Sequence, residues 1–149
     1  MRSVFAFASI VALAGCVTPL PADAPEFSQR AAPREGQNEI ELLAGFSGRL
    51  AIQDDCLGAV GVRGGDETFV TIVWPYNAQL ERDGPSWRVR NTQSGATIRV
   101  GQRIEGSGGY MGEFDAASLD QFNRFLTRKL GEGCASKGFF TLNRDFGTP

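Results

Sequence analysis

The chain has 149 residues, with 15 lysines and arginines, 17 aspartates and glutamates, no histidine and a formal net charge of −2. Without histidine there is no Ser–His or Cys–His nucleophile pair, and the commonest protein ligand of metal ions is missing. The slightly acidic balance argues against a general nucleic-acid-binding protein, which normally carries a basic balance.

The first residues have the pattern of an export signal. Arg2 precedes an apolar run over residues 4–14 that only Ser9 interrupts. This is typical of a secretory signal peptide, and the run is too short to span a bilayer as a helix of the mature protein. One interpretation is an ordinary cleaved leader, in which Ala12 and Ala14 serve as the small residues of the cleavage site.

The apolar run ends in Leu13-Ala14-Gly15-Cys16, which resembles the lipobox of bacterial lipoproteins. The resemblance implies that residues 1–15 are a lipoprotein signal peptide and that Cys16 carries a diacylglyceryl group and an N-acyl chain. Fatty acyl chains of that number anchor a protein stably to a membrane. In Gram-negative lipoproteins an Asp after the cysteine tends to retain the protein in the inner membrane. Val17 therefore points to the periplasmic face of the outer membrane.

The next segment is rich in proline and polar residues, with prolines at positions 19, 21, 25 and 33. Such a composition favours extended, solvated chain. We therefore expect residues 16–38 to comprise the lipidated Cys16 and a disordered tether, with a single β-rich globular domain over residues 39–149. The alternative is that the segment packs on the domain as an irregular arm.

Two cysteines remain once Cys16 is assigned to lipid. An exported chain meets an oxidising compartment, which favours pairing, so we predict a Cys56–Cys134 disulfide. Two free thiols or a redox pair are the alternatives, although a redox pair usually has C-x-x-C spacing.

Most of the domain has the pattern of short apolar segments and turns that is typical of a β-protein. Alternating or continuous apolar stretches are separated by turn signals such as Asp83-Gly84 and Ser94-Gly95. The strands expected from this pattern cover residues 46–53, 56–62, 68–74, 87–90, 97–100 with a continuation to 104, and 138–142. Short strands at this spacing predict a mainly β fold, a small OB-like barrel or sandwich of about five to six strands.

One C-terminal amphipathic helix completes the expected fold. Its apolar stripe has helical spacing and consists of Leu119, Phe122, Leu126 and Leu130. Asp115 or Ser118 would cap its start, and Gly131 or Gly133 would end it.

From Cys56 to Asn143 the layout resembles small secreted bacterial β-barrel proteins without an assigned function. The shared elements are a cysteine in an early strand, a strand ending in Trp-Pro, a strand of the type VRVGQRI leading into glycines, a second cysteine and a closing Gly-Phe-Phe strand. The resemblance supports the fold class. The expected helix lies between the last two strands, which departs from the usual OB order, in which the helix follows the third strand.

Two groups of residues are candidate binding surfaces. Arg88, Arg90 and Arg99, with Arg103 nearby, alternate outward from two neighbouring strands and could bind an anionic glycan or phosphate. The alternative is a solvated sheet face with compensating carboxylates. Ser107 and Tyr110 belong to a glycine-rich segment, residues 106–110, that resembles the Ser-Gly-x-x-Tyr loop by which membrane-bound lysozyme inhibitors enter an active-site cleft. An ordinary glycine-rich turn is the alternative.

No motif indicates catalytic residues, a metal site or a cofactor. We therefore expect a lipid-anchored cell-envelope protein that acts as a non-enzymatic interaction or structural module, with an envelope protein as partner and no nucleic acid. The alternatives are an inhibitor of a cell-wall hydrolase such as lysozyme, and a glycan-binding or hydrolytic domain.

Overall fold

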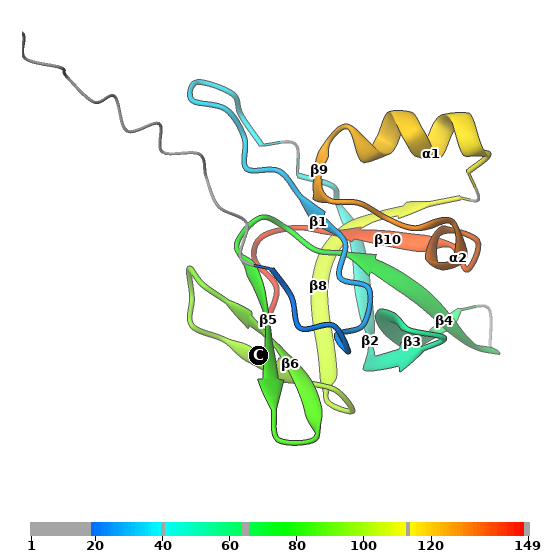
Figure 1. Ribbon diagram of the computed structural model, residues 1–149. Helices are drawn as coiled ribbons and strands as arrows, with labels where there is room; N and C mark the ends of the chain where they lie inside the picture. The colour runs from blue at the N-terminus through cyan, green and yellow to red at the C-terminus, as the bar shows by residue number, and fades with distance from the viewer. Residues whose placement is uncertain (1–18, 40, 64–65, 113, 148–149) are drawn as a thin grey trace, which may run out of the picture.

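The computed structural model describes residues 19–147 except residues 40, 64–65 and 113 (Figure 1). The leader and Cys16 therefore lie outside the described residues. The expected fold class is confirmed, because five strands close into a barrel in the order β10-β4-β3-β2-β8. These strands are β2 (Ala44–Gln53), β3 (Cys56–Arg63), β4 (Asp66–Val73), β8 (Arg103–Met111) and β10 (Phe139–Leu142).

The barrel has the pairing pattern of an OB-like Greek key. Strands β2, β3 and β4 form an antiparallel meander, and β8 pairs antiparallel with β2. The last strand, β10, fits between β4 and β8, parallel to the first and antiparallel to the second. Counted along the chain, the five barrel strands therefore follow the spatial order 1-2-3-5-4.

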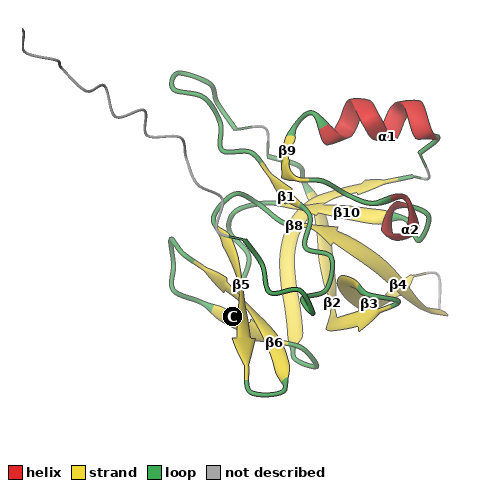
Figure 2. Ribbon diagram, in the orientation of Figure 1, coloured by secondary structure: helices red, strands yellow, loops and turns green. Residues whose placement is uncertain are grey.

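A three-stranded antiparallel sheet is inserted between β4 and β8 and lies below the barrel (Figure 2). It contains β5 (Ala78–Asp83), β6 (Ser86–Asn91) and β7 (Thr97–Arg99). Its buried face continues the barrel interior, because one hydrophobic cluster includes Trp87 and Ile98 of this sheet together with barrel residues such as Leu50. The inserted sheet thus closes one end of the barrel.

The expected continuation of the β7 strand to residue 104 is wrong. The chain turns at Gly101, which has a φ of +93°, and Ile104 belongs to β8 in the barrel sheet. The apolar alternation across residues 98–104 therefore belongs to two strands of different sheets.

The segment between β8 and β10 covers the outer face of the barrel (Figure 1). It contains α1 (Ala116–Asn123), β9 (Leu126–Arg128) and α2 (Glu132–Ala135). A second hydrophobic cluster forms beneath it, where Leu119 and Leu130 pack with Phe139 of β10. No helix among the described residues is long and apolar enough to cross a bilayer.

The expected helix is shorter than its apolar stripe. It begins as predicted at Asp115, whose side chain accepts a hydrogen bond from the Ser118 amide at 2.7 Å. It ends at Asn123, because the Asn123 side chain bonds both the N–H and the carbonyl of Leu130 and closes a turn. Leu126 and Leu130 are buried as expected, but from β9 and the following loop, so neither expected terminal glycine ends this helix.

The expected disordered tether is wrong for the part that lies against the domain. We call residues 19–31 the arm. Phe27 is 4% exposed and stacks on Trp74 at 5.9 Å, and Ser28 is fully buried. The arm continues as β1 (Gln29–Arg30), which pairs with β9. These residues instead match the alternative expectation, that the segment packs on the domain as an arm. The Phe27 side chain and the pairing of β1 with β9 hold them in place.

Candidate functional site

The predicted disulfide is present. Cys56 at the start of β3 and Cys134 in α2 are bonded, with their Cα atoms 5.6 Å apart. Both side chains are buried in the second hydrophobic cluster. The bond therefore fixes the segment that covers the barrel to the barrel wall, and it has a structural role.

The structure brings the predicted arginines together on the outer face of the inserted sheet. Arg88 and Arg90 lie on β6, and Arg99 on β7 is the direct cross-strand neighbour of Arg88. Their side chains are 35%, 42% and 56% exposed. Arg103 lies apart from them on β8, where it forms an ion pair with Glu105.

We call the surface formed by Arg88, Arg90 and Arg99 the arginine face, and each of its arginines has a carboxylate partner. Glu81 accepts hydrogen bonds from Arg88 at 2.9 Å and from Arg90 at 2.7 Å. Asp83 accepts one from Arg99 at 2.7 Å. The face thus carries three arginines against two carboxylates, and its chemistry is that of a nearly compensated sheet surface.

The pKa of Glu81 is lowered by its two arginine partners, as this charge compensation implies. Desolvation alone would raise the pKa, but the hydrogen bonds and charges of Arg90 and Arg88 outweigh it and lower the pKa below its ordinary value. Glu81 is therefore ionised at neutral pH and holds both guanidinium groups in place.

Ser107 and Tyr110 do not lie in a loop. Both belong to β8, where Tyr110 pairs with Phe140 of β10. The Tyr110 ring packs edge-on against Phe140 at 4.7 Å, and the Ser107 hydroxyl accepts a hydrogen bond from Asn143 at 2.9 Å. The expectation of a protruding glycine-rich segment is therefore wrong, because its glycines allow two barrel strands to approach closely.

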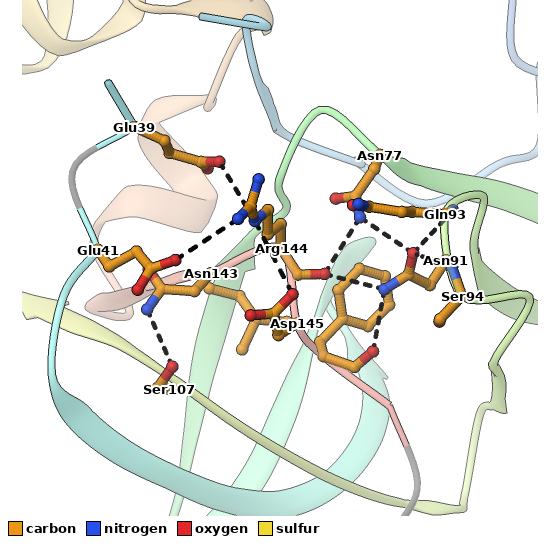
Figure 3. Close-up of polar contacts among 12 residues, drawn as sticks. Glu39, Glu41, Asn77, Asn91, Gln93, Ser94, Ser107, Asn143, Arg144 and Asp145 are labelled. Atoms are coloured by element: carbon orange, nitrogen blue, oxygen red, sulfur yellow. Dashed lines mark hydrogen bonds and ion pairs between the residues drawn. The ribbon is translucent and has the colours of Figure 1, made fainter. Parts of the chain in front are cut away.

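A polar cluster that the sequence analysis missed joins the C-terminal residues to the inserted sheet (Figure 3). The Asn91 side chain donates to the carbonyls of Arg144 and Phe146 and accepts a hydrogen bond from Asn77 at 3.0 Å. Asn77 itself donates to the Arg144 carbonyl at 3.1 Å. These buried amides satisfy backbone carbonyls of the irregular segment after β10, which meets β8 through one bridge between Gly147 and Glu105.

Glu39 links both ends of the domain through two arginines. It lies 3.1 Å from Arg30 of the arm and 3.9 Å from Arg144. Figure 3 shows the contact with Arg144. Desolvation lowers the pKa of Arg30, whereas a hydrogen bond with Tyr76 and the nearby Asp145 raise the pKa of Arg144. No sequence signal predicts this set, because its members are single charges far apart in the chain.

An open hollow lies between the arm and the inserted sheet. Pro19, Leu20 and Phe27 form its apolar side. The other lining residues are Pro21, Gln29, Ala32, Tyr76, Ala78, Gln79, Leu80, Thr92, Thr127 and Arg128. Among these described residues none has a carboxylate and Arg128 is basic, so the lining mixes apolar and neutral polar side chains with one cationic group.

The described residues include no group of three or more cysteine, aspartate or glutamate side chains placed to hold a metal ion. The fold places the domain in the class of small OB-like barrels with an inserted sheet. No family model, curated protein or solved structure matched the chain.

Proposed function

We propose that this protein is a lipid-anchored cell-envelope protein whose barrel is a non-enzymatic interaction module. The main observation in support of this proposal is the distribution of the three cysteines. Of the three in the chain, Cys56 and Cys134 form a buried disulfide, which leaves Cys16 at the end of the lipobox-like tetrapeptide. A structural disulfide is typical of oxidising compartments such as the periplasm, where lipoproteins are displayed.

The anchor is tested by Cys16→Ser with metabolic palmitate labelling and membrane fractionation. We expect the variant to lose the label and to leave the membrane fraction or accumulate as a precursor. The matched control is the double variant Cys56→Ser with Cys134→Ser, which keeps Cys16 and should keep the label. Undiminished labelling of Cys16→Ser would refute the lipoprotein assignment.

The outer-membrane location is tested at position 17. Val17→Asp should move the lipidated protein toward the inner-membrane fraction, whereas Val17→Ala should leave it in the outer membrane. A wild-type protein that fractionates with the inner membrane would contradict this location.

The interaction role is tested by photo-crosslinking from the intact envelope. Leu43, which is 91% exposed, and Arg99 on the arginine face are suitable positions for the crosslinker, with Asp120 on α1 as a comparison. A discrete adduct with an envelope protein supports the module. Inhibition of lysozyme by the purified domain, or salt-sensitive binding to peptidoglycan, would instead support the hydrolase-inhibitor or glycan-binding role.

A further inference from the structure

The arm brings the folded domain to within a few residues of the proposed anchor in the sequence. Leu20 and Ala24 pack against the main hydrophobic cluster, and Asp23 forms an ion pair with Arg82 of β5. The Ala24 amide bonds the Pro21 carbonyl at 3.0 Å, which closes a turn in the arm. The domain therefore begins at about residue 20, not at residue 39.

The length of the remaining chain limits the distance of the domain from the membrane. Two residues, Val17 and Thr18, separate Cys16 from Pro19, and even a fully extended chain spans no more than about 11 Å over these three Cα-to-Cα steps. The polar headgroup layer of one leaflet is about 5–8 Å thick. A domain attached within this reach contacts the headgroups with the surface that surrounds Pro19.

The chemistry of that surface suits a phospholipid headgroup layer. The hollow around Pro19 and Leu20 is bordered by Arg128 and by Tyr76, and its described lining has no carboxylate. Guanidinium groups attract anionic phosphates, and tyrosines are favoured at membrane interfaces. We call Pro19, Leu20, Pro21, Ala32, Tyr76 and Arg128 the arm face.

Resting on the proposed lipid anchor, we infer that the arm face docks on the headgroups of the bilayer that holds the anchor and gives the domain one fixed orientation. Strands β3 and β4 then extend away from the membrane, because Figure 1 shows them running to the right of the barrel, away from the blue start of the arm. A disordered tether would give no such preference.

The test is depth-dependent quenching in vesicles. The lipidated protein is reconstituted in phosphatidylethanolamine and phosphatidylglycerol vesicles that contain a nitroxide-labelled headgroup lipid. A fluorescent amino acid replaces either Ala32 on the arm face or Glu67 on β4, both of which are exposed. We expect quenching at position 32 to exceed that at position 67 by at least about twofold, because only the first lies within reach of the headgroups.

An insertion isolates the effect of chain length. Twelve Gly-Ser residues between Val17 and Thr18 would add a mean span of about 20 Å and should bring the quenching ratio close to one. The same insertion between Gly36 and Gln37 leaves the anchor reach unchanged and should preserve the ratio.

Two failures are distinguishable. If the protein carries no acyl chain and does not sediment with the vesicles, both the anchor and the docked orientation are wrong. If it sediments but positions 32 and 67 are quenched equally without the insertion, the anchor stands and the docked orientation is refuted.

Discussion

Glu81 is the residue on which the charge balance of the arginine face depends. It serves Arg88 and Arg90 together, and its pKa in the folded protein lies below the ordinary value. A carboxylate with a lowered folded pKa contributes stability above its unfolded pKa, and this contribution disappears as the pH falls through the folded pKa.

We therefore expect Glu81→Gln to lower the free energy of unfolding at pH 7 by no more than about 1 kcal/mol, since the pair is partly exposed. The difference between variant and wild type should shrink as the pH falls below the ordinary range of a glutamate pKa. Urea unfolding across pH measures it, with Glu67→Gln as an exposed control. A difference that persists undiminished at acid pH would show that the effect is not electrostatic.

Asn91 is the buried polar residue whose loss should matter most. It is 2% exposed and bonds two C-terminal carbonyls. We expect Asn91→Ala to destabilise the domain by about 2–5 kcal/mol, because each buried partner left unsatisfied costs about 1–3 kcal/mol. Chemical unfolding followed by tryptophan fluorescence provides the value. Gln93→Ala, at an exposed position nearby, should change stability by less than about 0.5 kcal/mol, and equal effects of the two variants would contradict the role of Asn91.

At the scale of elements, the glycines of β8 act through close strand contact. A Cβ on Gly108 would overlap the Thr141 carbonyl oxygen and the Phe140 ring of β10. Its pairing partner on β2 is Ala44, and the next residue, Gly45, has open space around its Cβ position.

Gly108→Ala should therefore cost about 1–3 kcal/mol of unfolding free energy through overpacking. Gly45→Ala is the matched control and should be neutral or slightly stabilising, because alanine restricts the unfolded chain. Thermal unfolding of both variants makes the comparison. A neutral Gly108→Ala would mean that β8 and β10 separate more easily than their packing suggests.

Most barrel strands were predictable because their apolar residues follow a local period. The alternation in β2 and the apolar run in β4 each identify a strand without knowledge of its partner. The boundary of α1 was not predictable, since Leu126 and Leu130 keep helical spacing while β9 pairs with the arm nearly one hundred residues away. Local periodicity reports burial, and the element that buries a residue depends on distant contacts.

The candidate site was predictable only in part. The alternation of arginines on β6 correctly placed them on one face, but their carboxylate partners lie on β5, which carries few apolar residues. The glycine-rich segment suggested a loop because glycine is common in turns, whereas here glycines relieve crowding between paired strands. Phe27 was the residue that could have indicated the packed arm, since burial of one large aromatic side chain suffices to fix a proline-rich segment against the domain.

For the whole molecule, the disulfide is the main covalent restraint. Its cysteines are separated by 78 positions in the sequence. The double variant Cys56→Ala with Cys134→Ala should lose up to about 4–5 kcal/mol of unfolding free energy, mainly because the unfolded chain gains freedom. Urea unfolding with and without dithiothreitol measures this. The reductant should destabilise the wild type and leave the double variant unchanged, and a double variant as stable as the oxidised wild type would refute the estimate.

The arm also determines how the molecule would respond to tension. Glu26 bonds the backbone on both sides of Cys56, through the Asp55 carbonyl and the Leu57 amide. Force applied through a bilayer anchor at Cys16 would thus be transmitted by the arm to the disulfide-linked start of β3 before any barrel strand separates from its neighbours. Under load the arm should peel away first, and the cross-linked barrel should resist longer. Single-molecule pulling from residue 16 should therefore show two unfolding events. The first, detachment of the arm, should occur at the same force with and without reductant. The second, unfolding of the barrel, should occur at a lower force when reductant is present.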